Sequence, residues 1–565
     1  MKTLLTMSLQ SKSNWILPET RKENFVETIL SNRGIKNTKK HLSPSLDSIP
    51  SFKKLFGATK AAQKILKDIK EDKKIVIHGD FDCDGICASA LLWEFLYRDV
   101  SKVLGKKVDV VPYIPSRIDQ GYGLTESSIQ DVKELGCDLL VTVDCGVRDK
   151  KLINKYLKEF DFVITDHHQP PEDISENLEY ILVHQMYPGK EYPHKEICGT
   201  SVVYLLIQAL MHELEMEENR EYGLDLVALS TVTDMMPLLD VNRVFVKYGL
   251  EQISKGRRLG LNSLILRAGI LPKDMNSYHL GYVVGPRINA AGRIGSPMEA
   301  VKLLVSNDEK QCNEISNELN NINFERQKLT TDIFDISKED INLDNKLLFV
   351  QGENWHEGII GLVAGKLSEQ FYRPVIVTTN NDGVIKGSAR SIKGFNITQT
   401  LEKFDKYLER FGGHELAAGF SAKTKSMDEF VEKIVDYANK KIKEEDLRRD
   451  IKVDILVDTQ DIDNELINNL KKLEPFGYGN PKPIICLKDL IVIRKNIMGQ
   501  ERNHMRLTVK GNGLNLLTLV LFNCNEDTES INENDNIDVI GYPDINVWNG
   551  NENIQFMVKE WRFSN

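Results

Sequence analysis

Apolar runs alternate with helix-like segments in the first half of the chain. Residues 73–78 (KKIVIH), 137–147 (CDLLVTVDCGV) and 162–169 (FVITDHHQ) are each predicted to contain a short buried strand that ends in polar residues. Stretches with helical periodicity lie between them, such as ICASALLWEFLY and DKKLINKYLKEF. Strands that alternate with helices predict an α/β fold with a doubly wound parallel sheet, whose ligand sites lie at the carboxyl ends of the strands.

The pattern changes after residue 305. Residues 308–340 are polar and contain no Pro or Gly, which predicts a long exposed connecting helix. NKLLFVQG and RPVIVTT then flank the helix-like IIGLVAGKLSEQ and predict a second, smaller α/β domain. A segment rich in Pro and Gly at 472–483 precedes several short strand-like runs, the pattern of a small antiparallel barrel. The predicted division is a basic N-terminal extension (1–60), the first α/β domain (61–305), the connecting helix (306–340), the second α/β domain (341–442) and the barrel (443–565).

Composition narrows the class of protein. Hydrophobic residues make up 41% and charged residues 28% of the 565 positions, which is typical of a globular protein. No run approaches the ~20 apolar residues that span a bilayer, and the N-terminus lacks the features of a signal peptide, so we expect no membrane association. The eight Cys residues include no CxxC pair, which favours reduced thiols, a cytoplasmic location and the absence of a structural zinc.

The net charge of −10 is unevenly distributed along the chain. Residues 1–60 contain 11 Lys and Arg against 4 Asp and Glu, a balance of +7, so the remaining residues sum to −17. A basic arm that attracts a polyanion and a solvated extension both fit this first stretch. Part of the negative charge elsewhere is expected on metal ligands.

The first strand ends in the cluster His78-Gly79-Asp80-Phe81-Asp82-Cys83-Asp84-Gly85. This D-x-D-x-D-G spacing resembles a calcium-binding loop, but that loop requires a Glu at its twelfth position and a preceding helix. Here the twelfth position is Leu91 and a strand precedes. Capping of the following helix accounts for one carboxylate but not for three and a His.

Three further clusters follow the same pattern. They are Asp144 in VTVDCGV, the run Asp166-His167-His168, and Asp234 in VALSTVTDMMPL. Each alone fits a turn, a helix cap or packing. Together they bring carboxylates and imidazoles to one edge of the sheet, which requires cations to neutralise the charge. A site rich in oxygen with one or two His suits Mn²⁺ or Mg²⁺ better than Zn²⁺.

These clusters resemble, in order, the four motifs of the DHH phosphoesterases. The resemblance implies that His78, Asp82 and Asp144 hold one divalent cation, and that a second is held by Asp84, Asp144, His167 and Asp234. It implies catalytic roles for Asp80, Asp166 and His168, with His168 near the substrate phosphate and Asp166 orienting the His pair. Two cations about 3.5–4 Å apart can clamp a phosphodiester and generate a hydroxide nucleophile.

Further segments resemble the RecJ-like single-strand-specific exonucleases within this superfamily. The segments are PSRIDQGYGL (115–124), GPRINAAGRIGSPMEA (285–300), WHEGIIGLVAGKL (355–367), GSARS (387–391), GGHELAAGF (412–420) and EPFGYGNPKP. The resemblance implies a DHH domain, a DHH-associated domain and an OB-like barrel. Substrate contacts are expected from Arg117, Arg287, Asn289, Arg293, Ser388, Arg390, Gly412, Gly413 and His414. Arg287 and Arg293 also fit simple pairing with structural carboxylates.

The resemblance implies 5′→3′ hydrolysis of single-stranded DNA to 5′-mononucleotides, in recombination and repair. A monomer is expected, with a single-strand-binding protein and a RecQ-type helicase as candidate partners. Two other functions remain open, namely a DHH phosphodiesterase for short oligoribonucleotides or cyclic dinucleotides and a non-catalytic replication scaffold. The chain departs from the family at Ser116, Gln120 and Ser230, where His, Glu and Gly are usual.

Overall fold

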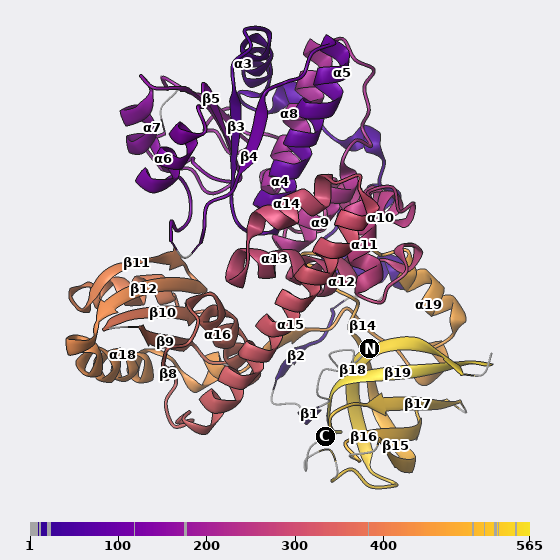
Figure 1. Ribbon diagram of the computed structural model, residues 1–565. Coiled ribbons are helices and arrows are strands. Elements are labelled where there is room, and N and C mark those ends of the chain that lie inside the picture. The colour runs from indigo at the N-terminus through magenta and orange to yellow at the C-terminus, as the bar shows by residue number, and fades with distance from the viewer. Residues whose placement is uncertain are drawn as a thin grey trace.

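The computed structural model describes residues 9–10, 13–19, 24–117, 119–174, 178–381, 383–499, 502–513, 515–524, 528, 530–548 and 551–564. Figure 1 shows two α/β lobes, a helical layer between them and a β-barrel that carries the C-terminus. No helix in these ranges is long and apolar enough to cross a membrane.

The first lobe contains a five-stranded parallel sheet in the order β4-β3-β5-β6-β7. Its strands are β3 (Ile75–Gly79), β4 (Val110–Tyr113), β5 (Leu139–Val143), β6 (Asp161–Asp166) and β7 (Ile181–His184). The chain moves from β3 to β4 on one side and then to β5 on the other. This reversal is the topological switch point at which open α/β sheets bind ligands.

Helices cover both faces of this sheet. They are α3 (Ala58–Lys70), α4 (Cys83–Glu94), α5 (Ser101–Leu104), α6 (Glu126–Glu134), α7 (Lys150–Tyr156) and α8 (Gly199–Glu213), with the π-helical η3 (Phe95–Val100) following α4. Ile75 and Ile77 of β3 pack in the core that includes α3, α4 and α8, whereas Val76 packs in the core of α6 and α7. Alternate side chains therefore face opposite helical layers, which confirms the doubly wound parallel sheet.

A helical layer follows the sheet. It contains α9 (Leu224–Thr233), α10 (Asp240–Ser254), α11 (Leu259–Arg267), α12 (Ser277–His279), the π-helical η5 (Leu280–Val284), α13 (Gly285–Ile294) and α14 (Pro297–Val305). α12, η5 and α13 follow one another without a break, so residues 277–294 form one helical rod. The connecting helix is α15 (Glu309–Glu339), whose 31 residues span about 46 Å.

The second lobe has a five-stranded sheet in the order β11-β12-β10-β9-β8, in which β8 and β9 are parallel and the other pairs antiparallel. Its strands are β8 (Leu348–Glu353), β9 (Val375–Asn381), β10 (Val384–Arg390), β11 (Leu408–His414) and β12 (Ala417–Lys423). Helices α16 (Glu357–Phe371) and α18 (Met427–Lys441) pack in separate cores on the two faces, and α17 (Ile397–Glu402) lies beside β11.

The C-terminal barrel closes through β15-β16-β17-β19-β18 and back to β15. Its strands are β15 (Ile485–Met498), β16 (His504–Lys510), β17 (Leu516–Leu521), β18 (Asn536–Trp548) and β19 (Asn551–Phe563); β13 (Asp450–Lys452), β14 (Ile455–Leu456) and α19 (Asn464–Lys471) precede it. The OB-like barrel is confirmed, but β17 and β19 are parallel rather than antiparallel. A closed ring with an odd number of strands cannot alternate direction throughout, so one parallel pair is unavoidable.

The basic stretch 1–60 differs from a free extension wherever the structure describes it. β1 (Leu9–Gln10) pairs with β19, and β2 (Asn14–Ile16) pairs with β13. α1 (Phe25–Asn32) adds Val26, Ile29 and Leu30 to the core of the barrel, and α2 (Thr38–Leu42) contacts α10. Residues 1–8, 11–12 and 20–23 of the predicted basic arm, and residues 525–527 and 529 of the acidic stretch in the barrel, lie outside the described residues.

Candidate active site

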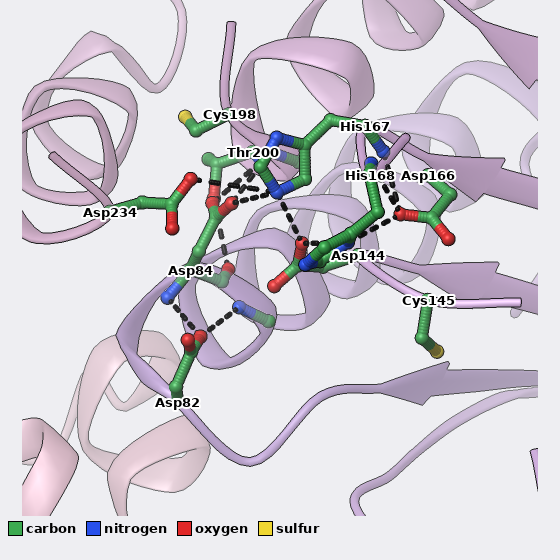
Figure 2. Close-up of polar contacts among 12 residues, drawn as sticks. Asp82, Asp84, Asp144, Cys145, Asp166, His167, His168, Cys198, Thr200 and Asp234 are labelled. Atoms are coloured by element: carbon green, nitrogen blue, oxygen red, sulfur yellow. Dashed lines mark hydrogen bonds and ion pairs between the residues drawn. The ribbon is translucent and has the colours of Figure 1, made fainter. Parts of the chain in front are cut away.

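The polar clusters that follow the strands meet at the switch point of the first sheet (Figure 2). Asp82 follows β3 and caps α4, since its Oδ1 accepts the N–H groups of Asp84 (2.9 Å) and Gly85 (3.2 Å). A Cβ at Gly85 would lie 2.4 Å from the Asp80 carbonyl oxygen, so the tight loop requires glycine there. Asp144 follows β5 with a φ of 63°, in the left-handed region.

The side chains from these segments converge around His167. Its Nε2 lies 3.1 Å from Asp144 Oδ1, 3.5 Å from Asp234 Oδ2 and 3.8 Å from Asp84 Oδ2. Three sets of ligand atoms each lie within 4.8 Å of one another: Asp84, His167 and Asp234; Asp80, Asp82 and Asp144; and Asp144, His167 and His168. Asp144 and His167 each belong to two of these sets, so they join neighbouring positions for cations.

The electrostatics of this cluster fit bound divalent cations. Burial and neighbouring carboxylates raise the pKa of Asp80, Asp144 and Asp234 well above the ordinary range. Burial lowers the pKa of His78 to about 4, so that imidazole is neutral. Several buried ligand atoms have no hydrogen-bond partner among the described residues: His78 Nε2, Asp80 Oδ1, Asp144 Oδ1, His167 Nε2 and Asp234 Oδ2. Cations would satisfy these atoms and neutralise the repelling carboxylates.

Three hydrogen bonds hold the Asp84 carboxylate. It accepts hydrogen bonds from the Gly199 N–H (2.6 Å), the Thr200 N–H (2.8 Å) and the Thr200 hydroxyl (2.6 Å), at the N-terminus of α8. The positive end of the helix dipole favours a carboxylate there. Ser230, one of the departures from the family pattern, lies 2.8 Å from Thr200 Oγ1 and extends this network.

His168 lies at the open side of the site, next to Asp166. Asp166 Oδ1 accepts the backbone N–H groups of His167 (2.7 Å) and His168 (3.0 Å) and lies 2.8 Å from His168 Nδ1. Burial opposes it, but the hydrogen bond and charge of Asp166 raise the pKa of His168. The same bond holds the pKa of Asp166 low despite burial. Asp166 thus fixes the imidazole and favours its protonated form.

Arginines from four separate segments gather beside the acidic cluster, and none has a carboxylate within ion-pair distance among the described residues. The group comprises Arg117, Arg287, Arg293, Arg326 and Arg390. Burial and then the charges of Arg117 and Arg326 lower the pKa of Arg293 to about 10. Burial and then Arg117 lower the pKa of Arg390. Such unneutralised guanidinium groups attract phosphates.

The observed contacts of Arg287 and Arg293 exclude simple pairing with carboxylates. Arg287 donates to Asn320 Oδ1 (3.2 Å) and the Val283 carbonyl (2.7 Å), and Arg293 donates to the Gly358 carbonyl (3.1 Å). Asn289, expected to contact phosphate, accepts the Cys83 N–H with its Oδ1 (2.7 Å). That oxygen therefore joins α13 to the start of α4.

The loop that carries Arg117 is held by two of the departures from the family pattern. Gln120 Oε1 accepts the Ser116 N–H (3.0 Å), and Ser116 Oγ lies 2.6 Å from Asp119 Oδ2. The Arg117 guanidinium lies over the Phe81 ring, 5.0 Å from its centroid. Ser116 and Gln120 therefore form a hydrogen bond at the positions where His and Glu are usual.

Two segments of the second lobe were expected to contact the substrate. Ser388 and Arg390 lie on the β10 face that is turned toward α16, and Arg390 Nη1 donates to Ser388 Oγ (3.3 Å). Arg390 is close enough to Arg117 and Arg293 to share their electrostatic field. Gly412, Gly413 and His414 lie exposed on the edge strand β11 and make no ion pair or hydrogen bond with the acidic cluster among the described residues.

Two residues at the site were not singled out by the sequence analysis. Tyr122 places its hydroxyl 3.0 Å from His168 Nδ1. Arg326 of α15 joins the arginine cluster, and its buried Nε has no partner among the described residues. The GYG loop contained the signal for Tyr122, whereas Arg326 is one charge among many in a polar helix and gave none.

A switch-point cluster of carboxylates and His, beside arginines from four segments of the chain, fits a DHH-type phosphoesterase. Family models agree: "DHH family, N-terminal domain" matches residues 74–231, "DHHA1 domain" matches 344–443 and "RecJ OB domain" matches 453–560. The chain belongs to the RecJ family.

Comparison with known proteins supports this assignment. The chain is 35% identical over 511 residues to the single-stranded-DNA-specific exonuclease RecJ of Bacillus subtilis, spanning 89% of this chain and 63% of that protein. It is 30% identical to the RecJ of Haemophilus influenzae, spanning 89% of both chains. The crystal structure of Thermus thermophilus RecJ in complex with Mn²⁺ superimposes with a TM-score of 0.83 at 25% identity, covering 98% of this chain and 80% of that one. The same enzyme has been solved with Mg²⁺.

Proposed function

We propose that this protein is a metal-dependent exonuclease that degrades single-stranded DNA from its 5′ end and releases 5′-mononucleotides. The observation that carries the proposal is the meeting of two oppositely charged clusters, one of carboxylates and imidazoles and one of arginines without carboxylate partners. A polyanion whose phosphate enters between them would be bound by the arginines directly and by the acidic cluster through the divalent cations held there. The RecJ relatives, named as single-stranded-DNA-specific exonucleases, supply the substrate class.

We assign the metal ligands from the resemblance to the DHH phosphoesterases, and the groups Asp80, Asp82 and Asp144, and Asp84, His167 and Asp234, in the acidic cluster support the assignment. His78, Asp82 and Asp144 would hold one divalent cation, with Asp80 close to the same point, and Asp84, Asp144, His167 and Asp234 would hold the second. Mn²⁺ and Mg²⁺ fit this set of oxygen and imidazole donors. When bound, two such cations supply a hydroxide nucleophile and neutralise the leaving oxyanion.

The other residues bind and orient the strand. His168, protonated and held by Asp166, donates a hydrogen bond to the phosphate or the departing oxygen. Arg117, Arg293 and Arg390 bind phosphates next to the cleaved bond. Arg287 and Arg326 extend the positive surface along α13 and α15. Ser388, Asn289, Gly412, Gly413 and His414 complete the proposed substrate contacts.

The wider role follows from the same assignment. We propose that the enzyme acts in DNA recombination and repair as a monomer that receives its strand from a single-strand-binding protein and a RecQ-type helicase. A cytoplasmic location is consistent with eight cysteines that are all free thiols. The DHH domain at 61–305 and the DHH-associated domain at 341–442 would form the catalytic unit, with the barrel at 443–565 alongside.

The test is product release from single-stranded DNA labelled separately at the 5′ and 3′ ends. We expect labelled mononucleotide to appear first from the 5′ label with Mn²⁺ and to disappear with EDTA. Early release from the 3′ label would reverse the proposed polarity. Absence of release from either end, with hydrolysis of a dinucleotide instead, would replace the proposal with a short-oligonucleotide phosphodiesterase.

A further inference from the structure

The backbone of the His167-His168 pair is held from two sides. On one side, Asp166 Oδ1 accepts the N–H groups of both residues, at 2.7 and 3.0 Å. On the other side, the Gln185 side chain donates its Nε2–H to the His167 carbonyl at 2.7 Å. His184 Nε2 lies 2.9 Å from the His168 carbonyl oxygen. All four polar groups of this dipeptide backbone therefore have side-chain partners.

The bonds of the His184 ring define which of its nitrogens carries the proton. The Met186 N–H donates to Nδ1 at 3.0 Å, so Nδ1 carries no proton. Nε2 is then the protonated nitrogen and donates to the His168 carbonyl. The ring is fully buried, and burial lowers the pKa of His184, which favours this neutral form. With both nitrogens engaged, the orientation of the ring is fixed.

The two side chains extend from a backbone that is fixed outside the metal site. His184 is the last residue of β7, and its N–H donates to the Phe56 carbonyl at 3.2 Å. The Phe56 ring stacks on Tyr187, with ring centroids 3.6 Å apart. The Gln185 carbonyl accepts the Tyr192 N–H at 2.8 Å. Since none of these contacts involves a proposed metal ligand, the support for the two donors is independent of the site.

We propose that Gln185 and His184 are positioning residues for the proposed hydrolysis. Gln185 places His167 for binding of a cation. His184 places His168 beside the substrate phosphate. Each bond acts on the side chain of the residue whose carbonyl it holds, because a shift of that peptide group moves the attached imidazole, and misplacement by about 1 Å can remove much of its effect. The inference rests on the proposed function, since that function gives the two histidines their roles.

The experiment measures metal affinity and turnover separately in the full-length protein. Mn²⁺ affinity is measured by isothermal titration calorimetry without substrate. The kcat is measured at saturating Mn²⁺ with 5′-labelled single-stranded DNA and with the small phosphodiester bis(p-nitrophenyl) phosphate. We expect Gln185→Met to weaken Mn²⁺ binding about 10- to 100-fold, because it removes the group that orients a metal ligand. We expect His184→Leu to lower kcat on both substrates about tenfold, with Mn²⁺ affinity within about threefold of wild type.

Matched and conservative variants separate positioning from general stability. Gln208→Met removes another buried glutamine whose Nε2 donates to one backbone carbonyl, that of Asn219 at 3.1 Å, and should leave both quantities unchanged. His184→Gln keeps an N–H donor at a similar reach and should restore most of kcat. Gln185→Leu removes the same donor with different packing and should show the same loss of Mn²⁺ affinity if the methionine variant folds poorly.

The outcomes decide the two residues separately. Wild-type Mn²⁺ affinity in Gln185→Met overturns the role of Gln185, and wild-type kcat in His184→Leu overturns that of His184. Equal losses of Mn²⁺ affinity in both variants would reduce the two residues to structural support. If the wild type releases no nucleotide from DNA, the proposed function fails, while Mn²⁺ binding and hydrolysis of bis(p-nitrophenyl) phosphate still decide the inference.

Discussion

Among single residues, Asp144 combines several constraints at one position. It is buried, adopts a φ of 63° and lies 3.1 Å from His167. A Cβ at Gly199 would lie 2.8 Å from Asp144 Oδ1, so α8 must begin with glycine to leave room for the carboxylate. Burial and the surrounding carboxylates raise its pKa, which shows that the metal-free protein pays for keeping it there. A site of this kind is retained for its ligand rather than for stability.

We therefore expect Asp144→Asn to lower kcat by at least about 10³-fold, because this side chain belongs to two of the three ligand sets. The metal-free variant should melt at a temperature equal to or above that of wild type, since a repelling carboxylate is gone, while Mn²⁺ should raise its melting temperature less. Asp138→Asn, at the amino end of β5, is the matched control and should stay active. Full activity of Asp144→Asn would remove it from the metal site.

Arg390 is the residue of the second lobe for which the structure gives the clearest role. Its guanidinium lies near Arg117 and Arg293 and has no carboxylate partner among the described residues. Arg390→Ala should raise KM for a 20-nucleotide strand by about tenfold, from one lost charged hydrogen bond, with little change in Mn²⁺ affinity. Lys433→Ala removes a cation from α18 on the opposite face of the sheet and should leave KM unchanged. Equal KM values for the two variants would exclude Arg390 from the path of the strand.

Among the elements, α10 fastens the first domain to the segment that leads into the barrel. Arg243, 2% exposed, donates to the carbonyls of Leu473 (2.9 Å) and Glu474 (2.5 Å) and to that of His41 (2.7 Å). A guanidinium has five N–H groups and can hold several turns of backbone at once. The loop after Asp234 packs on the same segment, since the Leu238 N–H donates to the Tyr478 carbonyl (2.7 Å). The barrel is thereby also linked to the loop that follows α9, and Asp234 at the end of α9 is a proposed metal ligand.

Arg243→Met should lower the free energy of unfolding by about 2–4 kcal/mol, because it leaves several buried carbonyls without donors. The change should be visible as a lower urea midpoint and as faster proteolysis between residues 472 and 483. Lys247→Met, one turn along α10 and partly exposed, serves as the control. Equal proteolysis of the two variants would show that the barrel is held by other contacts.

At the scale of the whole molecule, the two ends of the chain are joined. β1 pairs with β19, and α1 packs in the core of the barrel, so this core can close only after β19 has been synthesised. Arg33 then binds Asp454 at 2.6 Å, which fastens α1 to the start of the barrel domain. His41 lies buried in α2, where the N-terminal segment meets the first domain.

This junction predicts a dependence of stability on pH. Burial, followed by the charges of Arg243 and Arg33, lowers the pKa of His41 from 6.5 to about 4, against an opposing effect of Asp240. Between these values the unfolded chain binds a proton that the folded protein does not. The contribution of His41 is therefore complete above pH 6.5 and is lost as the pH falls toward 4, with a slope of at most about 1.4 kcal/mol per pH unit.

Urea denaturation at pH 7, 6 and 5 measures this effect. His41→Gln should flatten the loss of stability over this range, whereas His212→Gln on the exposed face of α8 should not. Parallel curves for wild type and His41→Gln would show that His41 is protonated without cost in the folded state.

Local features of this protein could be predicted from neighbouring residues along the chain. The strands after which Asp82, Asp144 and His167 stand follow from short apolar runs, and their parallel arrangement follows from the alternation with helices. The long helix and the barrel were also predicted, because a polar run without Pro or Gly and a series of short strands are signals contained within a few dozen residues. The motifs along the chain therefore identify the acidic and His side chains of the site, although they do not give the distances between them.

The way in which distant segments meet is visible only in the folded molecule. Folding brought Arg117, Arg326 and Arg390 together from separate segments, used the oxygen of Asn289 to cap α4, and packed α1 into the barrel. It also introduced the parallel pair β17–β19 and left Tyr278 and Tyr282 exposed beside the barrel. These outcomes depend on contacts between residues tens to hundreds of positions apart. Periodicity and motif spacing report only on neighbours along the chain, whereas packing and charge compensation between elements fix the rest.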